Sequence, residues 1–323
     1  MGKKISIGIG LLLILAGLGL FLQPDVSSLL LWLHTRHTIQ ALDNSAGHAG
    51  ASVEDAREPD ASQSEPCAAP VQGSKEADPR YQQMLAYNQE LYSSRQAAFT
   101  DERSYAELPE SLAGLDELGY IEIPAMKVTL PLYCGATEQH MAQGAAVLAQ
   151  TSMPIGGENT NCVIAGHRGY RGAPYFREIE KVQEGDLVYV TNLWETLCYR
   201  VREITIIAPN DNEAILIRDG EDLVTLLTCH PYRSGGKYRY LVICERCEGN
   251  SELESATQQS SQQKKKDRQG IIASDGAVFA SSEPEIRQEL MLRRIVSLLL
   301  CFLLIVLLFS LKRRLKSLKK RGV

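Results

Sequence analysis

Two uncharged apolar runs lie near the ends of the chain, at residues 5–21 and 295–311. Each is close to the shortest helix that can cross a bilayer core, since crossing takes about 17–25 apolar residues. A pair of lysines precedes the first run, and seven lysines and arginines follow the second between Lys312 and Arg321. Positive charges beside a span tend to stay in the cytoplasm. The pattern predicts two membrane-spanning helices, with both termini cytoplasmic and the residues between them outside the cell.

The first run has an alternative interpretation as a cleaved signal peptide. Its nearest small-x-small site, at residues 49–51, lies far beyond the run, whereas an ordinary cleavage site follows closely. An uncleaved anchor is therefore favoured. If both runs were instead buried helices of a cytosolic protein, the basic clusters outside them would have no explanation.

Two polar stretches separate the apolar runs from the middle of the chain. Residues 45–78 and 251–283 have too few bulky apolar side chains to offset the conformational entropy that folding would cost. We expect them to tether one folded domain. The predicted organisation is an N-terminal membrane anchor or signal peptide at 1–25, a stalk at 26–78, a helix and possible lid at 79–117, a folded domain at 118–250, a linker at 251–290, and a transmembrane helix with a basic cytoplasmic tail at 291–323.

The segment between the tethers changes its hydrophobic period near Leu118. From Tyr81 to about Phe99, apolar side chains recur at helical spacing, which predicts a helix. Beyond Leu118, short runs of valine, isoleucine, leucine and tyrosine alternate with glycine, proline and asparagine. The candidate strands are 119–123, 128–133, 161–165, 187–192, 197–207, 223–228 and 238–244. Many short strands with few helices predict a mainly β domain, a closed or nearly closed barrel.

Charge and cysteine content narrow the classes of function. The formal net charge is -5, and the basic tail suits a membrane surface rather than nucleic acid. Eight cysteines are too few and too irregularly spaced for a small disulfide scaffold. Cys244 and Cys247 form a single CxxC, which is half of a structural zinc site, so they are either a disulfide or two unrelated thiols. No metal-ligand cluster or phosphate-binding glycine loop stands out, and no metal or cofactor is expected.

Cys229 is the first candidate for chemistry. An apolar run leads from Leu223 to it, and Pro231 interrupts further strand pairing shortly afterwards. A strand would therefore deliver this thiol, rigidly held, to an exposed end. By itself, a cysteine at a strand end is more often a small packed residue than a catalyst. A catalytic role for Cys229 therefore depends on which other side chains lie near it.

His167 follows a second apolar run and is flanked by glycines in Gly166-His167-Arg168-Gly169. Two strands of one sheet could bring it beside Cys229, and pairing with histidine is a common way to activate a cysteine. His230 is closer in sequence. Adjacent residues of a strand point to opposite faces, however, so we expect His230 to face away from the Cys229 thiol.

Arg239 begins a third apolar run, after a turn through Ser234-Gly235-Gly236 that should return it towards Cys229. A guanidinium there could stabilise negative charge developing on an acyl oxygen. The alternative is a solvated surface arginine, and Arg233, Lys237 and Arg246 are local competitors.

Together, Thr225-Leu-Leu-Thr-Cys229, Gly166-His167 and Arg239-Tyr-Leu-Val resemble the motifs of the sortase family, in the right order and spacing between about Leu118 and Glu248. The resemblance implies a closed eight-stranded sortase-type β-barrel with short helices as the catalytic domain at 118–250. It also implies that Cys229 attacks an LPXTG-like sorting signal and that an amine resolves the thioacyl enzyme. His167 would be the acid–base partner, and Arg239 would stabilise the acyl oxygen.

Further segments resemble class C, the pilin-polymerising sortases; they are Tyr87-Asn-Gln-Glu-Leu91, Gly119-Tyr-Ile-Glu-Ile-Pro124, Cys229-His-Pro-Tyr232 and the C-terminal apolar run. The resemblance implies pilin substrates, a pilin lysine or a cell-wall peptide as the acceptor amine, and the cell membrane of a Gram-positive bacterium. The Asp-Pro-aromatic lid motif of many class C sortases is missing. Either the lid is absent, or Phe99 or Tyr105 covers the site in another way.

Three rival functions remain. A wall-anchoring sortase of another class differs only in its acceptor, whereas a non-enzymatic membrane-anchored surface protein would not need the Cys229 thiol. Another cysteine enzyme is disfavoured, because the chain lacks the Ser-His-Gly-Cys segment of L,D-transpeptidases. Its cysteine also follows the histidine, unlike that of papain-like peptidases.

Overall fold

The computed structural model describes residues 19, 26, 28–30, 32–42, 75–97, 108–170, 172–247 and 271–320. The chain divides into two compact units. The larger comprises Leu30–Tyr170 and Pro174–Ser282, and the smaller includes helix α5 (Glu283–Lys320). The candidate residues for chemistry all lie in the larger unit.

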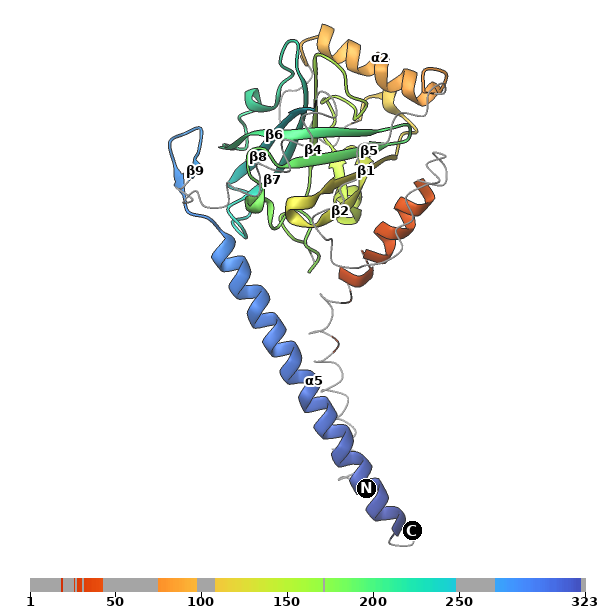
Figure 1. Ribbon diagram of the computed structural model, residues 1–323, viewed down its shortest axis with the longest axis vertical. Coiled ribbons are helices and arrows are strands. Elements are labelled where there is room, and N and C mark those ends of the chain that lie inside the picture. The colour runs from red at the N-terminus through yellow and green to blue at the C-terminus, as the bar shows by residue number, and fades with distance from the viewer. Residues whose placement is uncertain are drawn as a thin grey trace. The chain divides into compact units, whose positions relative to one another are not determined.

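The larger unit is built on a closed barrel (Figure 1), which confirms the predicted fold. Around the barrel the strands follow the order β1-β2-β3-β4-β7-β8-β6-β5. In chain order these eight strands are β1 (Glu117–Ile123), β2 (Val128–Cys134), β3 (Ala145–Val147), β4 (Thr160–Ala165), β5 (Leu187–Asn192), β6 (Thr196–Ile207), β7 (Asp222–His230) and β8 (Tyr238–Arg246). Most pairs are antiparallel, but β2 with β3 and β4 with β7 run parallel.

Strand β3 is the barrel strand that the hydrophobic pattern did not predict. It consists of Ala-Ala-Val, which is too short and too poor in β-branched residues to stand out in the sequence. All three residues are buried, because β2 lies parallel on one side of the strand and β4 antiparallel on the other. The strand exists because its neighbours supply its hydrogen bonds.

Helix α2 (Pro79–Ser93) covers part of the predicted helical segment. Asp78 caps its first turn by accepting a hydrogen bond from the backbone N–H of Arg80 at 2.8 Å. The helix ends at Ser93, earlier than the sequence pattern indicated. The reason is that Arg95 and Gln96 take positive φ values of 51° and 52°, which a helix cannot continue through.

Several shorter elements complete the larger unit. Helix α3 (Glu138–Gln143) and the 3-10 turns η3 (Pro124–Met126), η4 (Ile179–Lys181) and η5 (Glu213–Ile215) lie between strands, and the 3-10 turn η2 (Glu110–Leu112) precedes β1. Strands β9 (Ile271–Ile272) and β10 (Val278–Phe279) pair as a separate two-stranded sheet. This small sheet lies within the stretch 251–290 that was expected to be a linker.

Neither predicted membrane span is supported by the described part of the chain, in which no helix is both long enough and apolar enough to cross a bilayer. Most of the first run, 5–21, lies outside the described residues. The second run, 295–311, falls within α5, but the side chains of more than half of it lie outside the described part.

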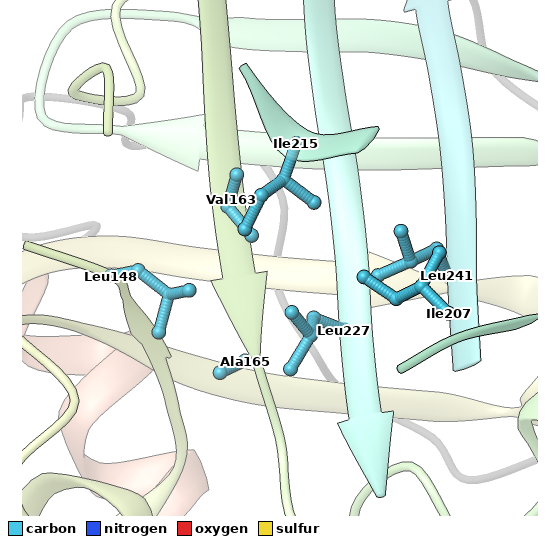
Figure 2. Packing of buried hydrophobic residues seen from close by; sticks show 7 residues of the cluster. All are labelled: Leu148, Val163, Ala165, Ile207, Ile215, Leu227 and Leu241. Carbon is cyan, nitrogen blue, oxygen red and sulfur yellow. The ribbon is translucent and has the colours of Figure 1, made fainter. Parts of the chain in front are cut away.

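One buried cluster includes residues from the three strands β4, β7 and β8 (Figure 2). It consists of Leu148, Val163, Ala165, Ile207, Ile215, Leu227 and Leu241. Ala165 of β4, Leu227 of β7 and Leu241 of β8 each lie two positions from one of the three candidates, His167, Cys229 and Arg239. Residues two apart on a strand share a face. The cluster therefore packs together the strands β7 and β8, which carry Cys229 and Arg239, and β4, which ends two residues before His167.

Candidate active site

Cys229 lies one residue before the end of β7, and its side chain is exposed. Strands β7 and β8 form an antiparallel hairpin in which Cys229 is the direct register partner of Arg239. The predicted return of Arg239 towards the cysteine is therefore confirmed. Strand pairing, and not a flexible loop, sets the separation of these two backbones.

His167 is carried to the same end of the sheet by the parallel pair β4 and β7. Their register runs up to Ala165 opposite Leu227. Beyond it, the Gly166 backbone N–H donates to the Leu227 carbonyl at 3.1 Å, and the Thr228 hydroxyl donates to the Gly166 carbonyl at 2.6 Å. These bonds hold the backbone just before His167 against the backbone just before Cys229.

The His167 ring lies half-buried among aromatic side chains. It stacks on Tyr170 with ring centroids 4.5 Å apart and meets the edge of Tyr175 at 6.1 Å. Burial lowers the pKa of His167 below 6.5, and the Glu138 carboxylate opposes this shift only in part. The imidazole is therefore mainly neutral at pH 7, in the form that can accept a proton.

The thiol of Cys229 and the guanidinium of Arg239 both lie close to Gly236. A Cβ added to Gly236 would lie 3.1 Å from Arg239 Nη1 and 3.3 Å from Cys229 Sγ. Arg239 Nη1 also donates to the Gly236 carbonyl at 2.7 Å and to the Tyr238 carbonyl at 3.2 Å. The turn before β8 thus orients the guanidinium next to the sulfur.

The local competitors of Arg239 lie elsewhere. The guanidinium of Arg233 lies over the Tyr232 ring, 5.6 Å from its centroid. Arg246 is at the opposite end of β8 and lies over the ring of Tyr199 at 5.4 Å. Lys237 is exposed on the turn. Among the four cations, Arg239 is the one whose strand register pairs it with Cys229.

The two glycines of this turn allow a matched test of the site. We expect Gly236→Ala to slow reaction of Cys229 with a substrate about 10- to 100-fold, because the new methyl group would displace the guanidinium, the sulfur or both. Gly235→Ala is the control. Its φ of +72° imposes a similar left-handed strain, but an added Cβ meets nothing within 4 Å. Stopped-flow thiol acylation would compare the two, and equal rates would contradict this geometry.

His230 points away from the thiol, as predicted. Its side chain is 2% exposed, and Arg168 Nη1 donates to His230 Nδ1 at 2.6 Å. Burial and the neighbouring Arg168 charge lower the pKa of His230 to about 4, although Glu180 acts in the opposite direction. His230 is therefore neutral and accepts a hydrogen bond from Arg168, so it is not available as an acid–base partner of Cys229.

A buried polar cluster behind the strand end was not found from the sequence. Arg168 forms an ion pair with Glu180, and Glu180 accepts hydrogen bonds of 2.7 Å from both the Ser281 hydroxyl and the Ser282 backbone N–H. Burial would raise the pKa of Glu180, but the Arg168 charge and these bonds lower it overall. Strand alternation was the available signal, since Arg168 and His230 directly follow His167 and Cys229 and so share the opposite face.

This cluster touches the backbone of the candidate nucleophile. Arg168 Nη1 lies 3.4 Å from the Cys229 carbonyl oxygen, and His230 is the next residue of β7. The His230 ring also packs edge-on against Phe279 of β10 at 5.0 Å. The cluster therefore supports the end of β7 from the face opposite the thiol.

Two further expectations from the sequence concern a lid over the site and the absence of a metal. Phe99 and Tyr105, the candidates for a lid, lie outside the described residues. Within the described ranges, no group of three or more histidine, cysteine, aspartate or glutamate side chains is arranged to hold a metal ion.

A closed barrel that presents an exposed thiol beside an arginine, with a histidine on the adjacent parallel strand, defines a class of cysteine-dependent β-barrel proteins. The comparisons identify the family. The sortase domain model matches residues 121–247. The solved complex of Streptococcus agalactiae sortase C1 with MTSET is 32% identical, covering 55% of this chain and 91% of that chain with a TM-score of 0.50.

Two further relatives agree with this match. Sortase C1 of GBS Pilus Island 1 is 27% identical over 67% of this chain and 99% of that chain, with a TM-score of 0.55. Sortase A of Bacillus anthracis is 29% identical over 40% of this chain, and the chain spans 61% of that protein's length. The chain belongs to the sortase family, which comprises cysteine transpeptidases. The resemblance drawn from the motifs is confirmed.

Proposed function

We propose that this chain is a sortase transpeptidase in which Cys229 is the nucleophile, His167 the acid–base partner and Arg239 the stabiliser of the acyl oxygen. The observation that supports this most directly is the approach of Cys229 Sγ and Arg239 Nη1 to the same position beside Gly236. A substrate carbonyl that reaches the thiol there would also meet the guanidinium.

The first step joins the substrate to the enzyme. The Cys229 proton passes to His167, and the thiolate attacks the carbonyl carbon between threonine and glycine of an LPXTG-like sorting signal. The carbonyl oxygen then carries negative charge, which the Arg239 guanidinium stabilises. Because Arg239 is already oriented by two backbone carbonyls, little reorganisation is needed when the charge develops.

The second step expels the leaving amine. When the carbon–nitrogen bond breaks, protonated His167 gives its proton to the departing nitrogen, and a thioester remains on Cys229. The half-buried position of His167 assists this transfer, since a lowered pKa makes the imidazolium a stronger acid. An acceptor amine then attacks the thioester, and Cys229 is regenerated.

A pilin lysine is the acceptor that we favour. The support is the match to sortase C1 of GBS Pilus Island 1, of which this chain covers 99%. A wall-anchoring role, with a cell-wall peptide as the acceptor, is the second candidate because the curated relatives are sortase A proteins. On this proposal the enzyme acts at the outer surface of a Gram-positive cell membrane, with both chain ends cytoplasmic, an orientation that rests on the apolar runs and their flanking charges in the sequence.

The test is mass spectrometry of the purified chain after incubation with an LPXTG-type peptide. We expect the acyl group on the tryptic peptide 219–233, which contains Cys229. Cys229→Ala should carry no adduct, whereas Cys247→Ser, a change at the opposite end of β8, should acylate normally. Lysine-bearing pilin peptides and wall peptides would then compete as acceptors. If the wild-type chain acquires no adduct from any sorting peptide, a non-enzymatic surface role replaces this proposal.

A further inference from the structure

Two cysteines, Cys198 and Cys247, lie close together near the end of β8 that is farther from Arg239. Cys198 of β6 and Cys247, the residue after β8, have their sulfur atoms 3.2 Å apart. We propose that these two residues form a disulfide bond that closes the barrel at this end. The pair is separate from the chemistry of Cys229 and goes beyond the proposed transpeptidase function.

The backbone geometry is suited to this bond. In the antiparallel pair of β6 and β8, Tyr199 is the register partner of Arg246, so Cys198 and Cys247 are the next pair along the ladder. The Cys247 backbone N–H donates to the Cys198 carbonyl at 3.0 Å. Hydrogen-bonded antiparallel partners have Cα atoms about 5.5 Å apart. That separation lies within the range of about 4.4–6.8 Å that a disulfide requires.

Two other cysteines of the described ranges, Cys244 and Cys134, are placed less suitably. The sequence left open whether Cys244 and Cys247 form a disulfide, but the residues are three apart at the end of one strand, and alternation directs them to opposite faces. Cys244 is fully buried, with its sulfur 3.8 Å from the Val242 carbonyl. Cys134 is also buried, with its sulfur against that of Met153. The structure thus favours Cys198 over Cys244 as the partner of Cys247.

The accessibility of the two thiols determines which one reacts first with an oxidant. Cys247 is partly exposed and Cys198 is buried. Cys247 attacks an oxidising disulfide, such as oxidised glutathione or a thiol–disulfide oxidoreductase, and forms a mixed disulfide while one thiol leaves. Cys198 then displaces the second thiol. Two protein thiols lose two protons and two electrons, and the oxidant is reduced to two thiols. Formation in the cell requires an oxidising compartment, which rests on the proposed surface location.

The disulfide would close a loop of the chain that contains two of the proposed catalytic residues. The loop from Cys198 to Cys247 contains all of β7 and β8, and therefore both Cys229 and Arg239. A disulfide across such a loop stabilises the fold, since it restricts the unfolded chain. It would also hold the end of β8 against β6 at the point where the chain leaves the barrel.

Peptide mapping tests the pairing directly. The purified full chain is treated with oxidised glutathione, its remaining thiols are alkylated at acidic pH, and it is digested with trypsin without reductant. Cleavage after Arg246 separates the two cysteines of the CxxC, because Cys244 lies in peptide 240–246 and Cys247 in peptide 247–264. We expect 247–264 to be linked to 182–200, which contains Cys198. A link to 240–246, or alkylation of both Cys198 and Cys247, would overturn the proposal.

Thermal unfolding provides the second measurement, and it does not depend on activity. Reductant should lower the melting temperature of the oxidised chain by about 10 °C. Cys247→Ser should melt at the same temperature with and without reductant, whereas Cys244→Ser, the matched control in the same motif, should keep the reductant-dependent shift. If the melting temperature of the wild-type chain is the same with and without reductant, a stabilising disulfide is excluded, whatever the outcome of the acylation test.

Discussion

Replacing Glu180 by glutamine should lower the free energy of unfolding by about 3–5 kcal/mol, which is the usual cost of removing one partner from a buried ion pair. The Arg168 and Glu180 side chains are only 3% and 6% exposed. Glutamine would leave the Arg168 charge buried without a counter-charge. Its amide N–H group would also replace one of the two oxygens that now accept hydrogen bonds, either the one facing Arg168 or the one facing the Ser281 and Ser282 donors.

Glu178→Gln is the matched control for this measurement. Glu178 also pairs with a cation of the same segment, Lys181, but the Lys181 side chain is 42% exposed. Surface pairs of this kind contribute about 0–1 kcal/mol. Urea unfolding at pH 7 would measure both variants. If Glu180→Gln unfolds at the same urea concentration as Glu178→Gln, the buried cluster does not stabilise the end of β7.

The second large effect is expected at Arg239. We predict that Arg239→Ala will slow acylation of Cys229 by an LPXTG-type peptide about 100- to 1000-fold, since loss of one oxyanion donor typically costs that much. The melting temperature should change little, because Arg239 is only partly buried and Nη1 bonds to the backbone carbonyls of Gly236 and Tyr238 in its own turn. Arg239→Lys should recover part of the rate, since an ammonium group retains the charge but not the planar donor geometry.

Arg233→Ala is the control for this prediction. Arg233 lies six residues earlier on the same turn, is exposed, and contacts the Tyr232 ring instead of the thiol. It should acylate within about a factor of two of the wild type, because surface substitutions away from special contacts have small effects. Equal losses in Arg233→Ala and Arg239→Ala would mean that net positive charge, and not the position of one guanidinium, accounts for the rate.

The sequence by itself predicted the order of the strands with strong apolar patterns and singled out the three residues proposed for the chemistry. These features are local. A short apolar run such as Leu223–Thr228 is typical of a buried strand, and the motif around Cys229 can be recognised without knowing its neighbours in space. The direction of His230 was also predictable, because alternation along a strand is a local rule.

Only the tertiary structure decided which distant residues meet. Strand β3 has almost no local signal and forms because β2 and β4 supply its hydrogen bonds. The ion pair of Arg168 with Glu180 and the approach of Cys198 to Cys247 join segments whose spacing along the chain carries no information about contact. Barrel closure places Cys198 beside Cys247, since it fixes the register of every strand against two others. Glu180 instead reaches Arg168 from the 3-10 turn η4.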